Sequence, residues 1–186
     1  MDIEIKNTVK ALAIGGVIVY PTDTIWGVGC DATNENAVAK IFELKKRAGS
    51  KSLIILVNDL DMLQEYIKKL PKKVACVLES TSRPTSVIYK NSKGLAANVI
   101  AKDNTVAIRI VNDEFCQNLI QKFGKPIVST SANYSGKPSP KSFDEIDKTL
   151  LDKVEYVVNL RQDEKQNRSS QLVKISSSGK IEFLRK

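Results

Sequence analysis

The chain has 186 residues, of which 42% are hydrophobic, so it is long and apolar enough to bury the core of one ordinary domain. No stretch approaches the roughly 20 apolar residues that a membrane-spanning helix needs, and the chain contains no histidine. The composition therefore excludes a membrane-spanning helix, serine or cysteine catalysis that relies on histidine, and zinc sites with histidine ligands.

The charge balance is strongly basic. Lysine and arginine together number 29 against 21 acidic residues, which gives a net charge of +8 and a pI of about 9.3. Such an excess fits a polyanionic ligand such as a nucleotide or a nucleic acid, and a solvated basic surface explains it equally well.

The cysteines and the N-terminus indicate the compartment. Cys30, Cys76 and Cys116 are too far apart in the sequence to suggest a metal site, and they predict reduced, buried thiols. The first ten residues, MDIEIKNTVK, lack the apolar core of a signal peptide. We therefore expect a cytoplasmic protein that does not bind a membrane.

Hydrophobic periodicity in the first half of the chain predicts alternating helices and strands. Asn34 and Asp59 are suitable N-caps, while Gly15-Gly16 and Pro21 stand where elements end. The predicted helices span 6–14, 34–45, 59–69 and a stretch that opens at Pro71, and the predicted strands span 17–20 and 52–57.

The second half continues the alternation, so the predicted class is α/β, a single domain over residues 1–186 with one mixed sheet covered by helices. Residues 80–105 are less regular and are the best candidate for a mobile loop over a site, and 162–170 is a second flexible stretch. The expected strands are 87–89, 106–111, 126–129, 154–158, 172–175 and 181–184, and the expected helices are 113–123 and a helix of about ten residues from Ser142.

Polar residues follow the strand at 17–20 in the segment PTDTIWG (21–27). α/β proteins place ligands on turns at strand ends, which makes Asp23 and Thr24 candidates for a binding site. A structural turn, in which these side chains satisfy local backbone groups and Trp26 fills the core, is slightly favoured by the residues alone.

The segment LKKRAGSK (44–51) contains four basic residues, and three of them are candidates for binding an anion. Lys45 and Arg47 would diverge by about 200° on a helix, but they share a side where the chain is extended. Because Gly49 marks the end of the helix, Lys45, Arg47 and Lys51 can converge on phosphates. Basic residues at a helix C-terminus also complement the helix dipole without any ligand, and this explanation is favoured here.

The segment PIVSTSANYSGKPSP (126–140) runs from an apolar strand into a loop rich in hydroxyl groups. Ser131 and Asn133 are two residues apart, so both can face one ligand such as a ribose, a phosphate or a metal-bridged phosphate. A plain surface loop is the alternative.

Arg109 lies inside the apolar strand TVAIR (105–109), so its charge needs either an ion pair or an anionic ligand. The glycine-rich loops of the two common nucleotide-binding motifs are absent from the sequence.

The chain resembles the YrdC family of threonylcarbamoyl-adenylate synthases in four segments that come in the family's order: YPTDTIWGVGCDA (20–32), KKRAGSKSLIILV (45–57), TVAIR (105–109) and PIVSTSANYSGKPSP (126–140). The resemblance implies a twisted α/β fold with a large basic concave cleft, in the short, single-domain form. It implies the conversion of L-threonine, bicarbonate and ATP, accompanied by Mg²⁺, to threonylcarbamoyl-adenylate and pyrophosphate. The threonylcarbamoyl group would then reach tRNA, directly or through partner proteins.

The resemblance also implies roles for individual residues. The family's K-x-R and S-x-N motifs make Lys45, Arg47, Ser131 and Asn133 the expected catalytic residues. L-threonine would be bound by Thr24, Arg109 and Ser170, and no protein side chain would bind the metal. The residues expected to bind ATP are Arg47, Lys51, Thr105, Ser131, Asn133, Ser139 and Arg185.

The chain departs from the family pattern at several positions. Trp26 stands where Tyr or Phe is usual, Ser52 where Pro is usual, and Gln171 where Thr is usual. The family's W-P-G-P stretch corresponds only to TSRPT (81–85), and no proline follows Ile110. Two alternatives stay open. The changed stretch at 81–85 suggests a diverged paralogue that acts on another carbamoyl-type substrate, and the net charge of +8 suggests a module that binds RNA or tRNA without catalysis.

Overall fold

The structure is a computed structural model that describes residues 1–46, 53–70, 74, 78, 81, 83–165, 168–176 and 180–186. Its helices are α1 (Asp2–Ala13), α2 (Glu35–Leu44), α3 (Leu60–Tyr66), α5 (Glu114–Phe123) and α6 (Lys148–Leu151), with 3-10 turns η1 (Ala97–Val99) and η2 (Phe143–Glu145). Its strands are β1 (Ile18–Tyr20), β2 (Gly27–Gly29), β3 (Ile54–Val57), β4 (Thr85–Lys90), β5 (Thr105–Ile110), β6 (Ile127–Ser131), β7 (Tyr156–Val157), β8 (Gln171–Ile175) and β9 (Ile181–Arg185).

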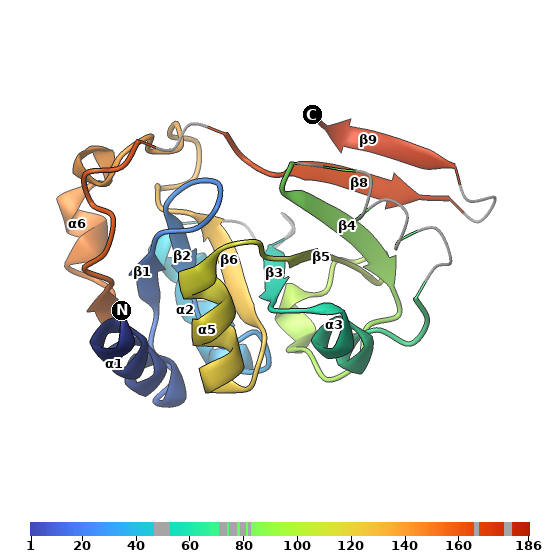
Figure 1. Ribbon diagram of the computed structural model, residues 1–186, viewed down its shortest axis with the longest axis horizontal. Coiled ribbons are helices and arrows are strands. Elements are labelled where there is room, and N and C mark those ends of the chain that lie inside the picture. The colour runs from blue at the N-terminus through green and yellow to red at the C-terminus, as the bar shows by residue number, and fades with distance from the viewer. Residues whose placement is uncertain are drawn as a thin grey trace.

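The strands of the described residues form one mixed sheet of nine in the order β7-β1-β2-β6-β3-β5-β4-β8-β9 (Figure 1). β3 pairs parallel with β5 and antiparallel with β6, and β4 pairs antiparallel with β5 and parallel with β8. The predicted α/β class, with a mixed sheet covered by helices, is confirmed.

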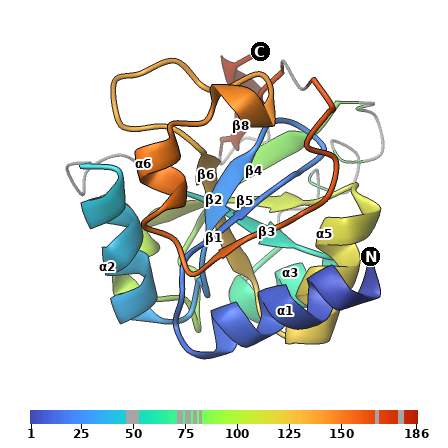
Figure 2. The same cartoon turned by 90° about the vertical axis from the view of Figure 1, so that its left-hand side faces the viewer.

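Two apolar layers cover the two faces of the sheet, as the alternation of side chains along each strand requires. On one face Ile55 packs in a cluster with Val38 and Ile41 of α2. On the other face Leu56 packs in a cluster with residues of α1 and α5. The view turned by 90° shows α2 on one side of the strands and α1 with α5 on the other (Figure 2).

Capping residues fix where several helices begin and end. Asn34 accepts hydrogen bonds from the backbone N–H groups of Asn36 and Ala37, Asp59 from that of Met62, and Asp113 from that of Cys116. Gly124 ends α5 in the left-handed conformation, at φ +75°. These starts and this stop were expected from the sequence, because caps depend on neighbouring residues only.

Several predicted elements are wrong or incomplete. α1 begins at Asp2 rather than residue 6, with Asp2 and Glu4 in a first turn that favours negative charge. The helix expected from Ser142 is split into η2 and α6, because Asp147 bonds to the backbone N–H and hydroxyl of Thr149 and starts a new turn.

The strand expected at 87–89 is confirmed, since it lies within β4. The mobile loop expected over a site at 80–105 is wrong for the described part of that stretch, which contains β4 inside the sheet and then η1. The helix expected from Pro71 lies largely outside the described residues, as do residues 166–167 of the second flexible stretch. None of the helices in the described ranges is long and apolar enough to cross a membrane.

β2 was not expected at all, since Gly-Val-Gly carries little strand propensity. The structure explains the glycine at position 29. A Cβ there would lie 2.4 Å from the carbonyl oxygen of Val128 and 2.7 Å from the ring of Tyr20. β2 therefore depends on close approach to β6 and to Tyr20, which the local sequence does not reveal.

Candidate functional site

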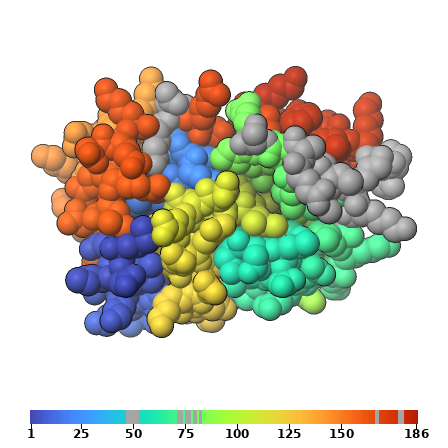
Figure 3. Space-filling view, in the orientation of Figure 1, coloured from blue at the N-terminus to red at the C-terminus, as the bar shows by residue number. Residues whose placement is uncertain are grey.

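A cavity of about 240 Å³ lies on the sheet face that carries α1 and α5. The alternation along β6 places Ile127 under the helices and Ser129 and Ser131 further along the same face, at the cavity. The space-filling view shows α1, α5 and α3 covering the lower half of this side, with the light-blue turn after β1 above α5 (Figure 3). Most lining residues carry hydroxyl groups: Thr24, Ser129, Thr130, Ser131, Ser139, Ser169 and Ser170.

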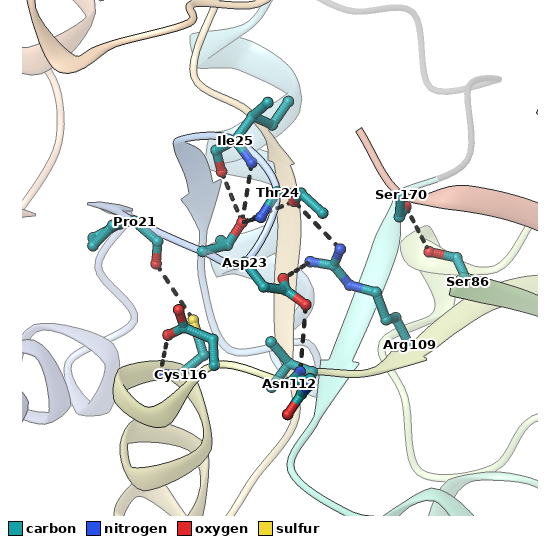
Figure 4. A network of polar contacts seen from close by, with 12 residues as sticks. Pro21, Asp23, Thr24, Ile25, Ser86, Arg109, Asn112, Cys116 and Ser170 are labelled. Carbon is teal, nitrogen blue, oxygen red and sulfur yellow. Dashed lines mark hydrogen bonds and ion pairs between the residues drawn. The ribbon is translucent and has the colours of Figure 1, made fainter. Parts of the chain in front are cut away.

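Arg109 enters the cavity from β5. Its side chain is 3% exposed, and its Nη2 pairs with the carboxylate of Asp23 at 3.1 Å. Nη1 donates to Thr24 Oγ1 at 3.3 Å, while the buried Nε has no hydrogen-bond partner within the described chain. The sequence left two explanations for this charge, an ion pair or an anionic ligand, and the structure provides an ion pair at the wall of a cavity (Figure 4).

The turn after β1 holds the partners of Arg109 in place. Thr22 Oγ1 donates to the carbonyl of Ile25 at 2.8 Å and accepts from the backbone N–H of Thr24 at 3.0 Å. The backbone N–H of Asn112 donates to the second carboxylate oxygen of Asp23 at 3.3 Å. Trp26 is fully buried, with its ring 5.0 Å from that of Phe143, as the structural explanation of this segment expected. The segment is thus both a rigid turn and part of the cavity wall.

Arg185 reaches the cavity from the other side because of a β-bulge between β8 and β9. Phe183 pairs with Val173 and Arg185 with Leu172, so two steps along β9 match one step along β8. The bulge turns Arg185 from the face of Phe183 to the opposite face, where it lines the cavity. Its Nε donates to the carbonyl of Ser170 at 2.8 Å and its Nη2 to the hydroxyl of Ser170 at 3.1 Å.

The two arginines make the cavity electropositive. The guanidinium pKa of Arg185 lies below its usual value, first because of burial and second because of the nearby charge of Arg109. Arg185 carries no carboxylate partner in the described residues, and no carboxylate lines the described cavity. The arrangement favours ligands that bring carboxylate or phosphate groups.

The loop after β6 is organised by Lys45, which follows α2 directly. Lys45 is 2% exposed, and its ammonium donates to the carbonyl of Ser131, to the carbonyl of Asn133 at 2.7 Å and to Asn133 Oδ1 at 3.3 Å. The hydroxyl of Ser131 donates to the same Oδ1 at 2.5 Å. The structure therefore brings Lys45, Ser131 and Asn133 together beside the cavity, and of the three only Ser131 lines it.

The other residues expected in the site are placed differently. Ser139, Ser170, Thr24 and Arg109 line the cavity together with Arg185. Thr105 does not: it is buried at the opposite end of β5, where its hydroxyl donates to Asp103 at 2.6 Å. The four-residue separation from Arg109 amounts to about 13 Å along a strand. Arg47 and Lys51 lie outside the described residues.

Two site residues were not assigned a role from the sequence. The sequence indicates Asp23 only as a polar residue of a possible binding turn, and no sequence signal predicts its pairing with Arg109. Ser86 in β4 is fully buried and shares a hydrogen bond of 3.0 Å with the hydroxyl of Ser170. No sequence signal identifies Ser86, because its contact depends on the parallel pairing of β4 with β8.

Comparison with known proteins identifies the family. The family model for Sua5, YciO and YrdC proteins, described as "Telomere recombination", matches residues 10–186. The chain belongs to the Sua5/YciO/YrdC family. The resemblance noted in the sequence is thereby confirmed.

Individual relatives agree with this membership. The chain is 34% identical over 152 residues to a threonylcarbamoyl-AMP synthase of Vibrio parahaemolyticus, covering 80% of this chain and 82% of the relative. It is similar to P. abyssi Sua5 solved with L-threonine, at a TM-score of 0.86 and 26% identity, over 100% of this chain and 54% of Sua5. It is also similar to HypF in a phosphate- and nucleotide-bound form, at a TM-score of 0.83 and 26% identity, over 98% of this chain and 28% of HypF. The chain thus spans about half the length of that Sua5.

Two departures from the Sua5/YciO/YrdC pattern meet in space. The side-chain oxygen of Gln171 accepts hydrogen bonds from the hydroxyls of Thr81 at 3.4 Å and Thr85 at 3.2 Å. The changed stretch at 81–85 and the changed residue 171 thus accommodate one another. Thr81, Thr85 and Gln171 are not among the residues that line the cavity, so these departures leave the cavity's described walls intact.

The described residues present few side chains that could bind a metal ion. They contain no group of three or more His, Cys, Asp or Glu side chains that could hold one. The cavity wall presents hydroxyl groups and guanidinium groups instead. Such a wall suits a ligand that is itself anionic.

Proposed function

We propose that this chain is a threonylcarbamoyl-AMP synthase, which converts L-threonine, bicarbonate and ATP to threonylcarbamoyl-AMP and pyrophosphate. The observation that carries the proposal is the cavity into which Arg109 and Arg185 project, in a chain that belongs to the Sua5/YciO/YrdC family. Every substrate of this reaction carries a negatively charged group that such a cavity can bind.

In this proposal, the amino acid binds at the Arg109 end of the cavity. Arg109 binds the carboxylate of threonine, held by its ion pair with Asp23. Thr24 and Ser170, whose positions are fixed by hydrogen bonds to Arg109 and Arg185, complete the pocket with hydroxyl groups. The similarity to P. abyssi Sua5, which was solved in complex with L-threonine, supports the assignment.

The chemistry requires positioning more than proton transfer. The neutral amine of threonine attacks the carbon of bicarbonate, water leaves, and a carbamate forms. A carbamate oxygen then attacks the α-phosphorus of ATP, and the bond to pyrophosphate breaks. Two guanidinium charges near the bound amino acid disfavour the ammonium form of its amine, which helps to supply the nucleophile. Alignment of the reactants and electrostatic stabilisation lower the barrier without a histidine.

ATP enters this scheme as its Mg²⁺ complex, with the metal held by the phosphates and water. Ser131 and Ser139 line the cavity and are proposed to contact the nucleotide. Arg47 and Lys51 are proposed to neutralise the charge that develops on the leaving pyrophosphate. The structure of HypF with phosphate and nucleotide bound is consistent with a nucleotide site in this fold.

The product is proposed to serve tRNA modification in the cytoplasm, with the threonylcarbamoyl group passed to tRNA directly or through partner proteins. Residues 1–186 are proposed to act as one domain, since a single sheet carries all strands of the described ranges. The diverged-paralogue alternative rests on the changed stretch at 81–85, and it has less support because Thr81 and Thr85 of that stretch contact Gln171 away from the cavity.

Pyrophosphate release tests the proposal. Purified protein is given Mg²⁺–ATP with threonine and bicarbonate added singly and together, and we expect release only when both are present. Replacing Arg109→Gln should raise the threonine KM by about tenfold or more. Release that is independent of threonine would refute the proposal. No release and no ATP binding would favour a module that binds RNA, for which the charge of +8 is the argument.

A further inference from the structure

The strongest unexplained feature is the buried ammonium of Lys45. It comes directly after the last residue of α2, and its backbone carbonyl also accepts from the N–H of Ser135 at 3.1 Å. Backbone and side chain together therefore tie the end of α2 to the loop after β6. Because Lys45 is only 2% exposed, the loss of hydration of its charge must be compensated by strong hydrogen bonds.

The contacts of Lys45 use its donors completely. An ammonium has three N–H groups, and three acceptors on the loop receive from it: the carbonyls of Ser131 and Asn133 and Asn133 Oδ1. A direct hydrogen bond from Lys45 to a phosphate would break at least one of these. The position therefore favours a role inside the protein over direct contact with ATP.

The network also fixes the direction of the neighbouring hydrogen bonds. Asn133 Nδ2 donates to the carbonyl of Lys137 at 2.5 Å, which orients the amide so that Oδ1 accepts from Lys45 and from Ser131. The only proton of the Ser131 hydroxyl is therefore given to Asn133. Ser131 lines the cavity, so the lone pairs of its Oγ are available there to accept a hydrogen bond.

We infer that Lys45 is a positioning residue, which holds Asn133 and thereby makes the Ser131 hydroxyl a hydrogen-bond acceptor towards the nucleotide. The inference rests on the proposed function, and it reassigns Lys45 from binding phosphate to organising the loop. The group that Ser131 accepts from is a donor on the substrate complex, such as a ribose hydroxyl or a metal-bound water. Without Lys45, the amide of Asn133 is free to turn and the Ser131 hydroxyl can rotate.

A double-mutant cycle tests the inference. The Kd of Mg²⁺–ATP and the rate of pyrophosphate release are measured for wild type, Lys45→Met, Ser131→Ala and the double variant. If Lys45 acts through Ser131, Lys45→Met should weaken ATP binding by about tenfold or more in the wild type and by no more than about twofold in the Ser131→Ala background. Losses that multiply in the double variant would overturn the inference, since an ammonium bound directly to ATP acts independently of Ser131.

Lys45→Arg provides a second test and a safeguard if Lys45→Met does not fold. Arginine keeps the charge, but its planar fork cannot place three donors on the acceptors that surround one ammonium. We expect Lys45→Arg to bind ATP as weakly as Lys45→Met, and restored binding would contradict the inference. Lys6→Met, the same change on an exposed residue of α1, is the matched control.

The outcomes separate the inference from the proposed function. A wild type that binds ATP but releases no pyrophosphate counts against the synthase activity, and the cycle is then evaluated on ATP binding alone. Multiplied losses in an active enzyme count against the role of Lys45 alone. A wild type that binds no ATP would overturn both.

Discussion

The buried guanidinium of Arg109 is held in a defined position by its neighbours. Its ion pair with Asp23 fixes one edge of the guanidinium, and Thr24 holds a second nitrogen. The carboxylate of Asp23 is itself fixed by the backbone N–H of Asn112. Because these partners hold the guanidinium in one position, we expect it to be pre-aligned for a carboxylate of the substrate.

This arrangement predicts the effect of replacing Asp23→Asn. Losing the ion pair should leave Arg109 less well oriented, so the threonine KM should rise by about tenfold or more while kcat changes less. Steady-state pyrophosphate release at varied threonine measures both constants. Asp23→Glu should recover part of the loss, because it restores the charge.

The control for this prediction is Asp61→Asn, the same change on an exposed residue of α3. It should leave the threonine KM unchanged. If the Asp23→Asn variant has the same unfolding free energy and the same threonine KM as the wild type, Asp23 does not position Arg109.

Among the elements, β9 and β2 depend most on long-range packing. β9 contributes Arg185 only because the bulge opposite Leu172 and Val173 reverses the face on which the side chain lies. β2 exists because two small glycines allow it to approach Tyr20 and β6. In both cases the function of the element lies in its register with a neighbouring strand.

Replacing Gly29→Ala should therefore destabilise the fold by about 1–3 kcal/mol, because the added Cβ overlaps Val128 and Tyr20. Urea unfolding measures the loss. Gly27→Ala is the matched control in the same strand, since its Cβ would lie 3.3 Å from the nearest atom, the hydroxyl of Ser129. We expect a clearly smaller loss there, and an equal loss in the two variants would contradict the packing argument.

The elements also show what local sequence can predict. Asn34, Asp59 and Asp113 were expected to begin helices, and each accepts hydrogen bonds from the first turn of its helix. Such signals work because the cap and its partners are only a few residues apart. The split of the helix after Ser142 was missed, because Asp147 competes locally for the backbone in a way that periodicity does not detect.

The sequence predicted which residues lie at the site better than it predicted how they contact one another. Four motifs selected residues that meet in space, including Thr24, Arg109 and Ser131. Their partners Asp23 and Ser86 were not given roles, since those contacts follow from strand pairing between distant parts of the chain. The motif also selects Lys45, but the local sequence gives no indication that its ammonium turns towards the loop.

At the scale of the whole molecule, burial of titratable groups links stability to pH. Burial raises the pKa of the thiols of Cys30 and Cys116, and nearby carboxylates of Asp31 and Asp113 add to the rise. Burial also raises the pKa of Tyr20. The folded chain therefore keeps protons that the unfolded chain loses in alkaline solution.

The sign of the pH effect follows directly. An unfolded thiol titrates near about pH 8.5, so the contribution of these groups to stability is fully present below that pH. It is lost as the pH rises from there towards the raised pKa values of the folded state, because the unfolded state then binds fewer protons. We expect the free energy of unfolding in urea to change little between about pH 6 and 8 and to fall above about pH 8.5.

Replacing Cys116→Ala should make the decrease of the unfolding free energy above about pH 8.5 less steep. A wild-type stability that rises above about pH 9 would contradict the raised pKa values of the buried thiols.

The same burial predicts that Cys30 and Cys116 react with a thiol reagent only after unfolding. Mass spectrometry of labelled peptides distinguishes them from Cys76.

The proposed activity of the whole molecule is one reaction at the cavity of Arg109 and Arg185. Its most direct test is to incubate the protein with Mg²⁺–ATP, L-threonine and ¹³C-bicarbonate and to identify the product by mass spectrometry. We expect threonylcarbamoyl-AMP that carries the ¹³C label and is absent when any one substrate is omitted. A protein that binds ATP and threonine but forms no labelled adenylate would contradict the proposed activity.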